Sequence, residues 1–270
     1  VKAYFGPDIY SADLPSDGAL KAINKWVNDK TNGMIPKLHD DNYDKDTIMV
    51  LLNALYMKVE WAHKFDAEST YDREFTKADG SAVTVPFMNM FEAYESYIKT
   101  EDAEGIMLPY DDGRLAFIAL KPGSGDARGY AASLTGAKLK EAIAAAKADT
   151  FVTVNMPKFS TGYSVYRADA LKAMGMTDAF DPDLADLTGA GRGVDGPLYI
   201  SYVFQKVKVD VDEEGTEAAA VTEIATAKGC ALPADEPIVL TFDKPFVYAI
   251  VDTETGVPLF AGVMENPEAK

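Results

Sequence analysis

Three side chains have the chemistry of catalysts: His39, His63 and Cys230, the two histidines and the one cysteine of the sequence. A Ser-His-Asp hydrolase would have to use one of these histidines as its base. Neither lies in a recognisable catalytic signature, and the Gly-x-Ser-x-Gly elbow of many hydrolases is absent from the sequence. Cys230 has no base nearby in the sequence and is expected to be an incidental exposed thiol. We therefore predict ordinary surface or strand-edge histidines and a chain that is not an enzyme.

One acidic segment imitates the first half of an EF-hand loop, with Asp40, Asn42 and Asp44 at alternate positions. Lys45 stands where that loop requires glycine, and Leu51 stands where it requires a bidentate glutamate. A solvated acidic loop is the better interpretation. The sequence also has no Cys/His cluster and no phosphate-binding glycine loop. We predict no metal site and no cofactor.

The composition is that of a soluble globular protein with a strong acidic excess. The 270 residues include 26 basic and 43 acidic side chains, which gives a net charge of −17. Nucleic acid and anionic membranes bind clustered Lys and Arg, so neither is an expected partner. No run of 18 apolar residues could span a membrane, and no targeting signal is visible.

Hydrophobic periodicity and turn residues predict a mixed α+β chain dominated by strands. Ser16 or Asp17 can cap the first helix, and Asp79-Gly80 and Asp112-Gly113 are typical of hairpins. Helices are predicted at 16–31, 131–148 and 164–174, and loops at 40–46 and 181–197. A buried strand is predicted at 48–60, with further strands at 71–76, 83–88, 105–109, 115–120, 151–156, 206–212, 238–242, 246–252 and 258–263. No linker interrupts this order, so we predict one domain over residues 1–270.

The segment after the strand at 206–212 has an unusual pattern. Thr216, Ala218, Ala220, Thr222 and Ile224 fall on one face of an extended chain, and Glu217 and Glu223 fall on the other. Such a segment can serve as a loop or as a strand whose inner face fits a tight slot. Its alanine run is equally compatible with a surface helix.

Several motifs in order resemble the serpin family over essentially all 270 residues. The run Glu-Glu-Gly-Thr-Glu-Ala-Ala-Ala is similar to the hinge of inhibitory serpins. These hinge residues are Glu213, Glu214, Gly215, Thr216, Glu217, Ala218, Ala219 and Ala220. The other matching segments are 23–27, 31–35, 52–61, 156–159, 171–176, 242–250, 259–263 and 266–267.

The resemblance implies a serpin-like fold with three mixed or antiparallel β-sheets, surrounding helices and an exposed reactive-centre loop at about 213–237. It further implies a serine-type endopeptidase inhibitor that acts as a suicide substrate, by loop cleavage and insertion into the central sheet. The bond cleaved would be Gly229–Cys230 or Lys228–Gly229, and the partner an elastase-like or trypsin-like protease. A monomeric, extracellular protein is expected. The alternative is a non-inhibitory serpin-like binding or storage protein.

Three more residues match family positions that control opening of the central sheet. Asn53 matches an asparagine in the middle of the sheet, and Trp61 matches a tryptophan near the place where the loop enters. Gln205 stands where many relatives have a histidine that bonds to that asparagine, and an amide can make the same bond. The resemblance also implies N-terminal helices and strands before Val1, so residues 1–270 alone are expected not to inhibit.

Overall fold

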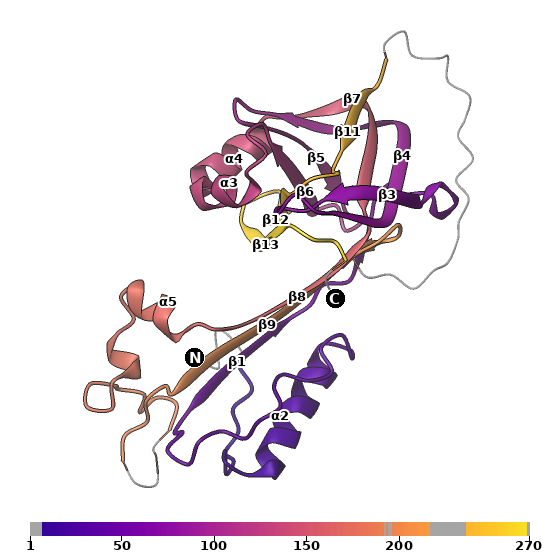
Figure 1. Ribbon diagram of the computed structural model, residues 1–270. Coiled ribbons are helices and arrows are strands. Elements are labelled where there is room, and N and C mark those ends of the chain that lie inside the picture. Colours follow the sequence, from indigo (N-terminus) through magenta and orange to yellow (C-terminus); the bar gives the residue numbers. More distant parts are fainter. Residues whose placement is uncertain (1–6, 192, 194–195, 217–235, 269–270) are drawn as a thin grey trace. The chain divides into compact units, whose positions relative to one another are not determined.

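The computed structural model describes residues 7–191, 193, 196–216 and 236–268. The chain divides into two compact units (Figure 1). The first consists of Val1–Tyr56 and Gly162–Lys208, and the second of Met57–Thr161 and Val209–Lys270. The mixed α+β class predicted from the sequence is confirmed.

Helix α2 (Asp17–Lys30), in the first unit, begins and ends at the expected residues. The Ser16 hydroxyl accepts a hydrogen bond from the Ala19 amide at 3.2 Å, which satisfies one of the free amides of the first turn. The apolar face of α2 buries Val27 against Phe204, Leu52 and Ala54. Figure 1 shows α2 beside the strands that carry these residues.

Strand β1 (Val50–Leu55) pairs in parallel with β9 (Tyr202–Val211), in a register that aligns Asn53 with Gln205. The prediction of one buried strand over 48–60 is wrong. Tyr56–Lys58 separates β1 from the two-residue strand β2 (Val59–Glu60), and Leu51 is 42% exposed. The helix α2 covers only the face of β1 that carries Leu52 and Ala54, so the alternate residues of β1 remain exposed among the described residues.

The helix predicted at 164–174 is wrong at its start. Residues 164–166 belong to β8 (Phe159–Tyr166), which pairs with β9, and only α5 (Ala168–Ala173) is helical. Pairing with β9 outweighs the weak helical periodicity of this segment. A short 3-10 turn, η2 (Asp178–Phe180), follows.

The second unit contains an eight-stranded sheet and both predicted hairpins. The order along the sheet is β11-β7-β4-β5-β6-β12-β13, with β3 paired to β4. The strand bounds are β3 Tyr71–Thr76, β4 Ala82–Lys99, β5 Ala103–Pro109, β6 Leu115–Pro122, β7 Ala146–Pro157, β11 Ile238–Thr241, β12 Phe246–Asp252 and β13 Pro258–Met264. A 3-10 turn, η1 (Ala67–Ser69), precedes β3.

Strand β4, with 18 residues, is the longest strand among the described residues. Its first half pairs with β3, its last residues pair with β5, and β7 runs beside most of its length. The register shifts between Met90 and Ala93, where Glu92 has a φ of 51°. Such a bulge bends the strand locally, and β7 remains its partner on both sides of the shift.

The sheet of the second unit is buried on both faces. Alternate residues of β6 and β12, such as Ile118 and Ala249, pack against α3 (Ala127–Ser133) and α4 (Gly136–Ala144). Phe117 and Tyr248 lie on the opposite face, within an aromatic cluster that includes Trp61. The helical prediction at 131–148 extends too far, because β7 begins at Ala146. None of the helices in the described ranges is long and apolar enough to cross a membrane.

Candidate functional site: the hinge turn

The chain reverses direction directly after β9, in a turn at residues 212–216 that we call the hinge turn. The Asp212 carboxylate accepts hydrogen bonds from the amides of Glu214 and Gly215 at 3.0 and 3.2 Å. The chain then returns as β10 (Gly215–Thr216), which pairs antiparallel with both β9 and β2. A Cβ atom on Gly215 would lie 2.2 Å from the carbonyl oxygen of Val59, so only glycine allows this approach.

Residues 61–65 hold the backbone of the hinge turn in place. The amides of Trp61 and Phe65 donate to the carbonyl oxygens of Glu214 and Glu213 at 2.9 and 3.0 Å. The indole Nε1 of Trp61 donates to the Asp212 carbonyl at 2.8 Å. Trp61 is itself only 2% exposed, so this short segment clamps three consecutive residues of the turn.

Charged groups reinforce this clamp. The Glu213 carboxylate is 8% exposed and accepts bonds from Lys158 Nζ at 2.7 Å and Thr70 Oγ1 at 2.8 Å. Burial alone would raise the pKa of Glu213, but these hydrogen bonds outweigh it and hold the pKa below its usual value. Glu214 pairs with Lys64 at 2.7 Å near the surface. Two lysines therefore pair with two of the three carboxylates of the hinge turn, and the third, that of Asp212, accepts backbone amides.

The last residue of the hinge turn that the structure describes is fully buried. Thr216 is 0% exposed, and its Oγ1 lies 2.6 Å from the Tyr110 hydroxyl. It aligns with Val211 on one side and Val59 on the other. The main chain of Thr216 thus lies between two strands, and its short side chain is buried against Tyr110.

Comparison with known proteins explains this arrangement. The family described as Serpin (serine protease inhibitor) matches residues 1–267. The chain belongs to the serpin family. Serpin B10 of Otolemur garnettii is 35% identical over 99% of this chain and 68% of its own length. Iripin-5 of Ixodes ricinus is 34% identical over 97% of this chain and 66% of its own length.

Solved serpin structures share the fold. Native Tengpin, a thermophilic serpin, has 36% identity and a TM-score of 0.86, over 97% of this chain and 66% of that chain. Thyroxine-binding globulin in complex with thyroxine has 26% identity and a TM-score of 0.85, over 100% of this chain and 70% of that chain. The chain spans about two thirds of the length of these relatives. Serpins are commonly protease inhibitors, and the family includes extracellular members.

The structure brings together some of the serpin residues predicted from the sequence. Glu213, Glu214, Gly215 and Thr216 form the hinge turn, and Trp61 contacts it. The remaining hinge residues, Glu217, Ala218, Ala219 and Ala220, and the cleavage residues Lys228, Gly229 and Cys230 lie outside the described residues.

Asn53 and Gln205 meet in the first unit. Gln205 Nε2 donates to Asn53 Oδ1 at 3.3 Å, so the expected bond between the two amides is present. The other end of the same amide accepts from Arg167 Nε at 3.0 Å. Gln205 therefore connects β1 with the residue that follows β8.

Sequence reasoning missed Lys158, Thr70 and Tyr110. Lys158 lies in the Met-Pro-Lys-Phe run that carries the family resemblance, yet only the fold shows its bond to Glu213. Tyr110 directly follows β5 and precedes the Asp111-Asp112-Gly113 turn, a place where turn chemistry draws more notice than an aromatic ring. No local pattern links either residue to a partner more than 50 positions away.

The two histidines differ from each other. His63 is largely exposed, as expected, and its Nδ1 lies 2.7 Å from the buried Glu95 carboxylate. Burial raises the pKa of Glu95. His39 is instead half-buried, with its ring against Tyr43, because the chain after α2 folds over Phe204. Burial lowers the pKa of His39. Among the residues that the structure describes, no three His, Cys, Asp or Glu side chains could hold a metal ion.

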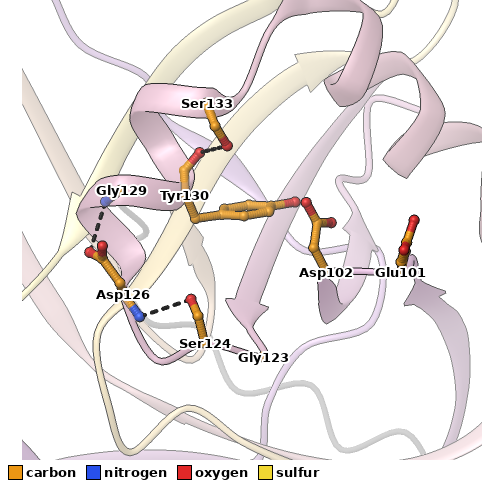
Figure 2. Close-up of a pocket in the computed structure, with 8 residues that line it drawn as sticks. All are labelled: Glu101, Asp102, Gly123, Ser124, Asp126, Gly129, Tyr130 and Ser133. Atoms are coloured by element: carbon orange, nitrogen blue, oxygen red, sulfur yellow. Dashed lines mark hydrogen bonds between the residues drawn. The ribbon is translucent and has the colours of Figure 1, made fainter.

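An open hollow of about 390 Å³ lies beside α3 and shares no residue with the hinge turn (Figure 2). Two of its three carboxylates already have partners: Asp126 accepts from the Gly129 amide at the start of α3, and Asp102 accepts from Thr100 and Lys138. Figure 2 shows the Tyr130 ring directed toward Asp102. We assign no ligand to this hollow.

Proposed function

We propose that this chain is the loop-bearing part of an inhibitory serpin. It would act on serine-type endopeptidases as a suicide substrate, by cleavage of the reactive-centre loop and insertion of the cleaved loop into the central sheet. The single domain, the loop at about 213–237 and the roles of Asn53, Trp61 and Gln205 in sheet opening are parts of this proposal. So are a monomeric state and an extracellular location.

The observation that carries the proposal is the burial of Thr216. This residue is 0% exposed between β9 and β2, so the hinge already adds a strand end to the sheet. The positions that would follow on the same face are the small residues Ala218, Ala220 and Thr222. A bulky, charged or proline residue there would oppose insertion, and none is present.

The chemical step would be supplied by the protease. Its serine oxygen attacks the carbonyl carbon of Lys228 or Gly229, the peptide C–N bond breaks, and an ester to the protease forms. The proton of the serine passes to the released amine of the following residue. Insertion then has to outrun hydrolysis of this ester by water.

The full-length gene product should be mixed with an elastase-like and a trypsin-like protease. A covalent complex that survives denaturing electrophoresis is expected, and mass spectrometry of the released peptide would identify the cleaved bond. A new amino terminus at Gly229, which means cleavage after Lys228, favours a trypsin-like target. Cleavage without any complex would contradict the proposal and favour the binding or storage protein instead.

A further inference from the structure

The hydroxyl groups of Tyr110 and Thr216 form a buried pair in the second unit. Their oxygen atoms are 2.6 Å apart, and the two residues are 1% and 0% exposed. Burial raises the pKa of Tyr110, so its phenol stays protonated at physiological pH. Each hydroxyl can therefore donate to or accept from the other.

The ring of Tyr110 is fixed by the residues that clamp the hinge turn. It stacks on the Trp61 indole, with ring centroids 4.8 Å apart and planes 6° from parallel. Trp61 in turn donates two hydrogen bonds to the hinge turn, one from its amide and one from its indole. The Tyr110 amide is held by the Leu115 carbonyl at 3.0 Å. The stacking and the amide bond thus fix the position from which the Tyr110 hydroxyl contacts Thr216.

The side chain of Thr216 needs a hydrogen-bond partner of its own. Within the described residues, its main chain is aligned with Val211 of β9 and Val59 of β2, and this pairing does not involve the hydroxyl. The buried threonine hydroxyl gives up its hydrogen bonds to water. It therefore needs a partner inside the protein, because a buried hydroxyl without one destabilises the fold. The Tyr110 hydroxyl is the partner that the structure gives it.

We propose that Tyr110 is a positioning residue whose hydroxyl holds Thr216 in place as the first residue of the inserting strand. The inference rests on the proposed inhibitory function. With Thr216 already in place, insertion extends a formed strand end and avoids the entropy of placing the first residue. Without the hydrogen bond between Tyr110 and Thr216, insertion starts later, and a larger fraction of the protease esters is hydrolysed before the loop has inserted.

The test uses Tyr110→Phe, Thr216→Val and the double variant in the full-length protein. Each single variant leaves one buried hydroxyl unpaired, whereas the double variant removes both, so the singles should be impaired and the double largely restored. We expect hydrogen–deuterium exchange of the hinge turn to be about 5- to 30-fold faster in each single variant. The number of serpin molecules cleaved per protease trapped should rise in parallel. Tyr97→Phe is the matched control, because its hydroxyl lies 3.5 Å from Glu104 on β5.

The two readouts separate this inference from the proposed function. Unchanged hydrogen–deuterium exchange of the hinge turn in Tyr110→Phe would show that Tyr110 does not hold Thr216 in place, whatever the protein inhibits. Faster exchange with an unchanged ratio of cleaved to trapped molecules overturns the role in insertion. A wild-type protein that traps no serine protease overturns the proposed function, and the role in insertion fails with it.

Discussion

The indole ring of Trp61 lies flat against the phenol ring of Tyr110, with ring centroids 4.8 Å apart. The same indole donates to the Asp212 carbonyl at 2.8 Å. Trp61→Phe keeps an aromatic ring for stacking but removes this donor, so it should lower the free energy of unfolding by about 1–3 kcal/mol. Urea denaturation measures the loss. Trp26→Phe is the control, because its indole bond to Asp8 is exposed and should change stability by less than about 1 kcal/mol.

The Glu213 carboxylate provides a prediction about pH. Its pKa is lowered in the fold, so its charge stabilises the protein above about pH 4.3, the ordinary value of a glutamate. This stability is lost as the pH falls below that value through the folded pKa. Glu213→Gln should therefore cost about 1–2 kcal/mol at pH 7, since Lys158 is partly exposed, and the difference should shrink at pH 3. A constant difference across this range would contradict the assignment.

The buried Glu95 should behave in the opposite way. Its pKa is raised by burial, so the protonated form suits the fold, and stability is lost as the pH rises through the folded pKa. Glu95→Gln removes the buried charge while its amide oxygen can still accept from His63. We expect it to raise the thermal midpoint at pH 7, by a free energy on the order of 1 kcal/mol, and to be neutral near pH 3. Glu254→Gln, on an exposed side chain, serves as the control.

Gly215 should tolerate no side chain. A Cβ there would meet the Val59 carbonyl oxygen at 2.2 Å and the Glu60 Cα at 2.7 Å, and both belong to the backbone. Gly215→Ala should cost about 1–3 kcal/mol and detach β10 from β2. Gly136→Ala, in the first turn of α4 with open space around it, should instead be neutral or stabilising by about 0.4–1 kcal/mol. Equal effects of the two changes on thermal unfolding would refute the close approach.

Gln205 should influence the pairing of β1 with β9. Gln205→Ala loses the bonds to Asn53 and Arg167, which should weaken this pairing by about 0.5–1.5 kcal/mol. Hydrogen–deuterium exchange of Val50–Leu55 would report the change. Gln205→Glu still accepts from Arg167 but cannot donate to Asn53, so it tells which bond matters. A variant with wild-type exchange would show that neither bond does.

The sequence was informative where local chemistry decides the structure. Ser16 marks the start of α2, and Asp79-Gly80 and Asp112-Gly113 mark hairpins, because capping and turn residues act within a few positions. It was misleading where distant pairing decides, as at residues 164–166, which β9 draws into a strand.

The hinge turn shows both situations at once. Its pattern of small residues was visible in the sequence, and so was its resemblance to serpins. Its partners Lys158, Thr70 and Tyr110 lie 55 to 143 positions away from Glu213 or Thr216, and no local pattern encodes such contacts. The sequence thus reveals the hinge residues more readily than the distant side chains that contact them.

The two tryptophans of the chain fall one in each compact unit, Trp26 on α2 and Trp61 beside the hinge turn. One is half-buried and the other almost fully buried, so their fluorescence emission should differ. Trp26→Phe and Trp61→Phe therefore yield two single-tryptophan proteins, each with a native optical probe of one unit. Within each variant, a fluorescence midpoint that coincides with the midpoint from circular dichroism would mean that the units melt as one cooperative body. A fluorescence midpoint that differs from it in the same variant would mean that one unit can unfold while the other stays folded.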